Sequence, residues 1–141
     1  MKICDQYSHH YGFERIQREY GLYRELEEIL TESNLRFGSN SPREIKRKIS
    51  ERFNQKGWAD KVKVGNSNLT ISFLKFKIGI CFQIGNVART YADILKLCQL
   101  NKMGVIDAGI IVVPHKLESN KMGTNYAQFD RLSSELFQFK D

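Results

Sequence analysis

The chain has 141 residues, of which 41% are hydrophobic and 27% charged, a composition that suits one folded domain and excludes disordered and collagen-like classes. Lysine and arginine number 22 against 16 aspartates and glutamates, and this net charge of +6 favours a polyanionic partner. No run is apolar enough to span a bilayer and the first residues, MKICDQYSHH, lack a secretory signal, so we expect a cytoplasmic protein with no membrane partner.

Two helices are predicted in the first half of the chain. Residues 14–33 carry apolar side chains at three- and four-residue spacing, namely Tyr20, Tyr23, Leu26, Ile29 and Leu30. A second helix begins at Ser41-Pro42-Arg43-Glu44, which has the form of a capping box with proline in the first turn, and it ends at Gly57. Its buried face is predicted to contain Ile45, Ile49 and Phe53.

The second half is predicted to be mostly sheet with two more helices. The expected elements are a strand at 61–64, hairpin strands at 69–76 and 78–84, a helix at 87–103, a fully buried strand at 107–114 and an amphipathic helix at 125–139. The hairpin should turn near Lys75–Lys77, and Gly85 and Asn86 should separate it from the helix. Because that helix joins the strands at 78–84 and 107–114, we expect these two strands to be parallel within a mixed sheet.

Positive charge is concentrated between Arg36 and Lys63, where nine basic residues meet three acidic ones. Such a block favours a surface that faces nucleic-acid phosphates, and a solvated helix face is the alternative. The candidates for DNA contact in this block are Arg43, Lys46 and Arg47.

The hairpin presents Ser72, then Cys81 nine residues later, then Gln83, and Asn86 before the next helix. This segment resembles the metal-binding hairpin of type II restriction endonucleases of the Bgl/Bam branch, within the PD-(D/E)XK nuclease fold. Those enzymes present an Asp, a Glu-x-Gln about nine residues later, and an Asn before a helix. The resemblance extends through residues 23–30, 46–58, 85–96 and 106–114, and covers about 20–137.

The resemblance implies one α/β domain over residues 1–141, a restriction-endonuclease-like fold with a central mixed sheet flanked by helices. Residues 1–13 are expected to be mobile, and the family's C-terminal strand is expected to be absent. Three further DNA-contact candidates follow from the resemblance: Lys75, Asn86 and Arg89. For Asn86 a plain helix cap is the alternative.

The implied catalytic positions are Ser72, Cys81 and Gln83, so a serine and a cysteine replace the family's metal-binding acids. Mg²⁺ prefers hard carboxylate oxygens, and no acid lies between Asp60 and Asp93, so we predict no metal site. Acids of the first helix, Glu25 and Glu28, are the carboxylates expected to approach. A nucleophilic pair of Cys81 with His115 is the weaker alternative to a buried, inert thiol.

The sequence therefore predicts a DNA-binding nuclease relative with a degenerate, non-cleaving site and no cofactor. Its expected partners are double-stranded DNA and a second copy of the chain. Two alternatives remain open at this stage. One is an active Mg²⁺-dependent endonuclease with unusual ligands, and the other is a small protein-interaction module on the same fold.

Overall fold

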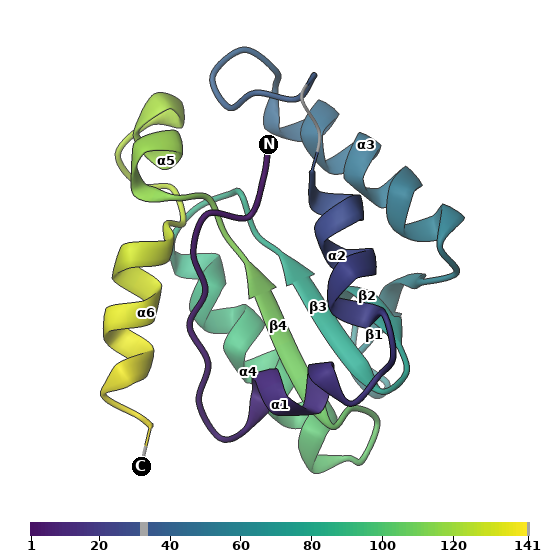
Figure 1. Cartoon of the computed structure of the whole chain (residues 1–141). Coiled ribbons are helices and arrows are strands. Elements are labelled where there is room, and N and C mark those ends of the chain that lie inside the picture. The colour runs from purple at the N-terminus through teal and green to yellow at the C-terminus, as the bar shows by residue number, and fades with distance from the viewer. Residues whose placement is uncertain (32–33, 141) are drawn as a thin grey trace.

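A four-stranded mixed sheet forms the centre of the protein in the computed structural model, which describes residues 1–31 and 34–140. The strands lie side by side in chain order: β1 (Ala59–Lys63), β2 (Thr70–Lys75), β3 (Ile78–Phe82) and β4 (Ala108–Val112) (Figure 1). Pairing is antiparallel for β1–β2 and β2–β3 and parallel for β3–β4. The predicted hairpin, the predicted parallel pair and the α/β class with a mixed sheet are confirmed.

The hairpin turns at Phe76 and Lys77, within the predicted region. Both residues have positive φ, 52° and 61°. Two successive left-handed residues define the turn whose twist matches that of paired β-strands. The turn therefore fixes the register in which Lys75 faces Ile78.

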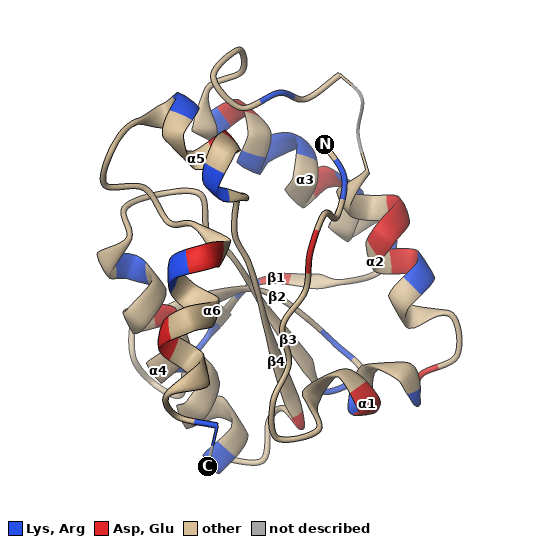
Figure 2. Ribbon diagram, turned by 60° about the vertical axis from the view of Figure 1, so that its left-hand side comes forward, with Lys and Arg blue, Asp and Glu red and all other residues tan. Residues whose placement is uncertain are grey.

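Helices cover both sides of the sheet. The described residues form α1 (Gly12–Gln17), α2 (Leu22–Leu30), α3 (Pro42–Gln55), α4 (Ala88–Lys102), α5 (Lys116–Met122) and α6 (Phe129–Phe137). Figure 2 shows α2 and α3 on one side of the strands and α4 and α6 on the other. Two apolar cores result. One joins α2 and α3 to the sheet, where Phe53 stacks on Phe73 with ring centroids 4.0 Å apart, and the other joins α4 to the sheet through Leu97 and Leu100.

The prediction of one helix over 14–33 is wrong, because the chain forms α1 and α2 with a break between them. Gly21 adopts a positive φ of 72° at the start of α2, a conformation that glycine tolerates without steric cost. Tyr20 lies in the break and is fully exposed, so it does not belong to the buried face. Positions 32–33 of that prediction lie outside the described residues.

The start of α3 is confirmed as predicted. The hydroxyl of Ser41 accepts a hydrogen bond from the amide of Glu44 at 3.1 Å, and Pro42 occupies the first turn. The predicted face of Ile45, Ile49 and Phe53 is buried, at 0–1% exposure. Gly57 follows the helix with a φ of 86°, which directs Trp58 back onto the core.

Two predictions for the C-terminal third are wrong in detail. The strand predicted as fully buried is β4, which lies at the edge of the sheet, and only its first residue, Ala108, is buried. The helix predicted over 125–139 begins at Phe129, and α5 precedes it without having been predicted. Gly123, between these two helices, has a φ of 146° and separates them.

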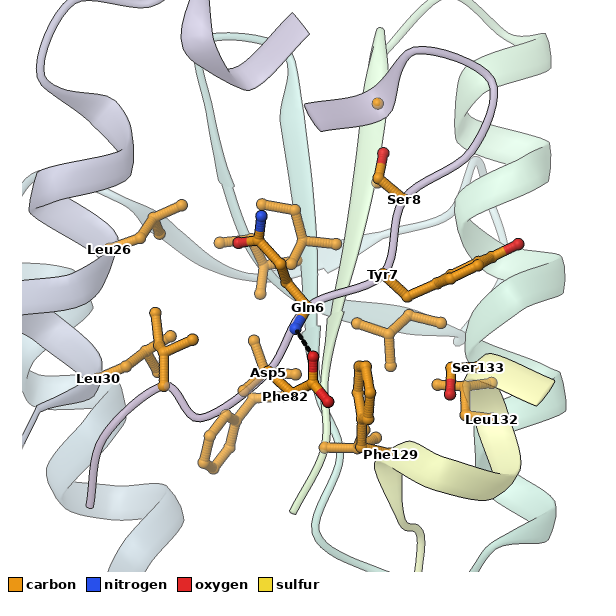
Figure 3. Close-up of a pocket in the computed structure, with 18 of the residues that line it drawn as sticks. Asp5, Gln6, Tyr7, Ser8, Leu26, Leu30, Phe82, Phe129, Leu132 and Ser133 are labelled. Atoms are coloured by element: carbon orange, nitrogen blue, oxygen red, sulfur yellow. Dashed lines mark hydrogen bonds between the residues drawn. The ribbon is translucent and has the colours of Figure 1, made fainter. Parts of the chain in front are cut away.

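The N-terminal segment, residues 1–11, crosses the sheet beside β3 and β4 and covers part of a cleft of about 1710 Å³ (Figure 3). Met1 and Ile3 pack against the core of α2 and α3, and Phe82 and Phe129 also line the cleft. The expected mobility of residues 1–13 stays a prediction. Across the two described ranges, no helix combines the length and the apolar character needed to cross a membrane.

Candidate functional site

Ser72 lies where the pairing of β2 with β3 ends. The ladder pairs Phe73 with Ile80 and continues only toward the turn. Beyond it, the hydroxyl oxygen of Ser72 accepts a hydrogen bond from the amide of Phe82 at 2.9 Å. The side chain thus satisfies a backbone donor that would otherwise be buried without a partner.

Cys81 is buried on β3, on the face of the sheet that α4 covers. Burial, followed by the nearby charge of Asp93, raises the pKa of the Cys81 thiol to about 12. The thiol is therefore neutral at physiological pH and is a poor nucleophile and metal ligand. His115, the other member of the alternative nucleophilic pair, caps α5 by accepting from the amide of Leu117 at 3.4 Å. The structure thus gives Cys81 and His115 separate partners.

Gln83 and Asp93 form a buried polar pair at the end of β3. Gln83 Nε2 donates to Asp93 Oδ2 at 2.7 Å, and Gln83 Oε1 accepts from the amide of Gly85 at 3.0 Å. The second carboxylate oxygen, Asp93 Oδ1, accepts from the ammonium of Lys96 at 3.1 Å. Both polar ends of the Gln83 amide and both oxygens of Asp93 are therefore engaged.

Asp93 is the site residue that the sequence prediction missed. Not every apolar residue of the central helix faces the sheet, since Leu95 is 71% exposed. The face of α4 that is buried consists of Thr90, Asp93, Leu97 and Leu100. These four positions have helical spacing in the sequence. Two of them are polar, so a search for apolar residues at that spacing does not find them.

Two of the predicted catalytic positions, Cys81 and Gln83, are thus brought to Asp93. The third, Ser72, contacts the adjoining backbone of β3 at the amide of Phe82. Their assignment as catalytic positions stays a prediction. The acids expected to approach lie elsewhere: Glu25 binds Lys75 and the indole of Trp58, while Glu28 pairs with Arg24 and Lys56.

Three cations lie near the Gln83–Asp93 pair, and we call them the cation cluster: Lys46, Arg89 and Lys96. Burial lowers the pKa of Lys46, and the charge of Arg89 lowers it further, whereas Asp93 opposes this shift. Arg89 extends across Gly85, where a β-carbon would lie 3.7 Å from its Nη1 atom. Within the described residues, Lys46 and Arg89 have no ion-pair or hydrogen-bond partner for their side chains.

The remaining DNA-contact candidates occupy different settings. Arg43 is exposed on the basic stretch of α3 that Figure 2 shows in blue, and Arg47 pairs with Glu51 at 2.7 Å on the same helix. Lys75 is not brought to the cluster, because its ammonium binds Glu25 at 3.2 Å and the carbonyl of Lys56 at 2.6 Å. Asn86 accepts from the amide of Ala88 at 2.8 Å, which is the capping role given above as its alternative.

The chemistry of these groups does not fit a divalent metal ion. Mg²⁺ requires several hard oxygen ligands, most of them charged. Asp93 is the one carboxylate that the structure brings to the described hairpin site, and Lys96 already neutralises it. The hydroxyl of Ser72 is committed to the backbone, and the thiol of Cys81 is neutral and soft.

The mixed sheet with a parallel β3–α4–β4 unit, and the hairpin whose end meets the first turns of α4, define a protein of the restriction-endonuclease-like class. The model of the restriction endonuclease BglII/BglIII family matches residues 4–141. The chain therefore belongs to this family. A comparison with curated proteins gave no match.

Proposed function

We propose that the chain is a DNA-binding relative of the type II restriction endonucleases, of the PD-(D/E)XK kind, whose degenerate site does not cleave DNA. One observation carries the proposal. The two positions that the resemblance equates with the family's metal-binding acids hold Ser72 and Cys81; Ser72 bonds the backbone and Cys81 is buried. A site without paired carboxylates cannot fix a metal ion beside a scissile phosphate.

Binding to double-stranded DNA does not require that ion. Membership of the BglII/BglIII family and the basic face of α3 support a DNA partner. Arg43 is exposed there, and Lys46 is half-buried without a partner among the described residues. Cations of this kind neutralise phosphates and release counterions, so we expect affinity that falls steeply with salt. A second copy of the chain is the further proposed partner.

Two measurements test the proposal. Fluorescence anisotropy of a labelled duplex, titrated over a range of salt concentrations, should give a log–log slope of about −0.9 for each phosphate neutralised. Incubation of supercoiled plasmid with Mg²⁺ or Mn²⁺ should leave it intact. An absence of binding even at low salt, or binding insensitive to salt, would favour the protein-interaction module instead.

An active endonuclease is the second candidate, and Asp93 is the observation that favours it. This carboxylate accepts a hydrogen bond from Gln83 Nε2 at 2.7 Å, so one acid lies at the hairpin site. If the plasmid is nicked with Mg²⁺ and Asp93→Asn abolishes the nicking, the active enzyme is the correct assignment. Nicking that persists in Asp93→Asn would indicate a contaminating nuclease.

A further inference from the structure

The charge around the Gln83–Asp93 pair is opposite to that of a metal-binding site. The three members of the cation cluster lie near a single carboxylate, so the group carries a net charge of +2. A divalent cation would be repelled by this arrangement, whereas a phosphate group would be attracted. The site therefore has the charge of an anion-binding site.

Lys96 is held in place by its contact with Asp93. Its ammonium lies 3.1 Å from Asp93 Oδ1, and its side chain is 19% exposed, so the cation is fixed and still reachable from solvent. An ammonium has three donor hydrogens. The bond to Asp93 uses one of them and leaves donors for a bound anion.

Arg89 lies beside Gly85, the residue whose amide binds Gln83. A β-carbon at Gly85 would lie 3.0 Å from Gln83 Oε1 and 3.7 Å from Arg89 Nη1. The absence of a β-carbon lets Gln83 Oε1 approach the backbone closely, and the guanidinium of Arg89 lies next to the same position. Arginine presents a planar set of donors that matches the oxygens of a phosphate.

Together these contacts give fixed positive charge where an active relative would need a metal ion. We propose that the cation cluster binds a backbone phosphate of DNA directly, so that the protein holds DNA without any divalent metal. This inference rests on the proposed DNA-binding function and deepens it. The ammonium of Lys96 and the guanidinium of Arg89 supply the positive charge. Asp93 holds Lys96 in position, and Gln83 in turn holds Asp93.

The first test compares metal-free and metal-containing conditions. Affinity for a labelled duplex of arbitrary sequence is measured by anisotropy in EDTA and in Mg²⁺ at matched ionic strength. We expect equal or tighter binding in EDTA, because Mg²⁺ only competes for the phosphates. Affinity that rises in Mg²⁺ would overturn the inference, because it would show that the bound state takes up the ion.

The second test removes the charges one at a time. Arg89→Met and Lys96→Met should each lower affinity about tenfold and make the log–log salt slope less steep by about 1. Lys102→Met, an exposed lysine on the last turn of α4, is the matched control and should bind as the wild type does. Arg89 is exposed and outside the buried pair, so its variant tests the inference even if Lys96→Met fails to fold.

The outcomes separate this inference from the proposed function. Suppose that the wild type binds DNA without metal and that both variants bind with the same affinity and the same salt slope. This result would overturn the phosphate site but leave the DNA-binding function intact. If the wild type binds no DNA at low salt, the proposed function fails, and the inference fails with it.

Discussion

Gln83 and Asp93 lie ten positions apart on different elements, and the amide of one donates to the carboxylate of the other at 2.7 Å. Asp93 is 4% exposed, and its second oxygen binds Lys96. One buried carboxylate thus joins the end of β3 to the inner face of α4. Removal of a single member of such a network costs more than the network contributes to stability, because its partners remain buried and unsatisfied.

Asp93→Ala should therefore lower the free energy of unfolding by about 3 kcal/mol. The loss comes from the uncompensated ammonium of Lys96 and the unpaired amide of Gln83. Urea unfolding followed by circular dichroism measures it. Asp60→Ala, at an exposed position of β1, is the control and should change stability by less than about 0.5 kcal/mol. Equal midpoints for the two variants would mean that the pair contributes little.

Cys81 should make stability depend on alkaline pH. Burial raises the pKa of its thiol from 9.0 to about 12, so the folded state holds the proton more tightly than the unfolded chain does. This contribution is fully present below about pH 9 and is lost as the pH rises to about 12. Cys81→Ala should flatten the decline of the melting temperature over that window.

The same burial predicts the reactivity of the three cysteines. Cys4 and Cys98 are exposed and should react with a thiol reagent in the native protein, whereas Cys81 should react only after unfolding. Spectrophotometric titration with and without denaturant counts the reactive thiols. A native protein in which all three react rapidly would contradict the burial of Cys81.

Restoring acids at the hairpin should create a metal site. The double variant Ser72→Asp with Cys81→Glu would place two carboxylates near Asp93. Their repulsion should lower the melting temperature in EDTA, and Mg²⁺ should raise it again by binding the folded state. Each single variant should respond little, because it leaves the ion under-coordinated. A melting temperature of the folded double variant that is indifferent to Mg²⁺ would show that these positions are not a former metal site.

The cap of α3 gives a prediction about the basic helix itself. Ser41→Ala should cost about 1 kcal/mol of stability, because the amide of Glu44 loses its partner. Ser39→Ala, in the loop before the helix, is the matched control. Among the contacts described for Ser39, the hydrogen bond comes from its backbone amide, which the substitution keeps. Chemical unfolding of both variants measures the difference. A loss of similar size in both would point to the loop rather than to the cap.

Local signals in the sequence were sufficient for the hairpin and for α3. The turn at Phe76 and Lys77 and the cap at Ser41 depend on neighbouring residues only, so both could be predicted. The break before α2 was missed because the apolar spacing continues across Gly21, whose conformation decides the outcome. The exposure of β4 depends on its position at the edge of the sheet, and no local sequence pattern indicates that position.

The candidate site was predicted only in part, and for a different reason. The nine-residue spacing brought Ser72, Cys81 and Gln83 to one place on the hairpin. Asp93 comes from α4, and its role depends on which side of that helix faces the sheet. Apolar residues occur on both the side of Leu95 and the side of Asp93, so an apolar criterion does not choose between them, and the structure buries the latter. Polar burial requires a partner, and Gln83 can be recognised as that partner only in three dimensions.

The mixed character of α4 has a consequence for how uniquely the protein folds. Two sides of this helix, rotated by a fraction of a turn, compete for the sheet: one contains Tyr91 and Leu95, and the other contains Asp93 and Leu97. Hydrophobicity alone separates them poorly, and a core chosen on that basis loses its single ordered state before it loses its stability. Gln83 accepts only one rotation of α4 about its axis, because only that rotation presents the carboxylate of Asp93 to its amide. The polar pair thus fixes the rotation of α4 about its axis, and a variant with Leu at both positions should lose this constraint.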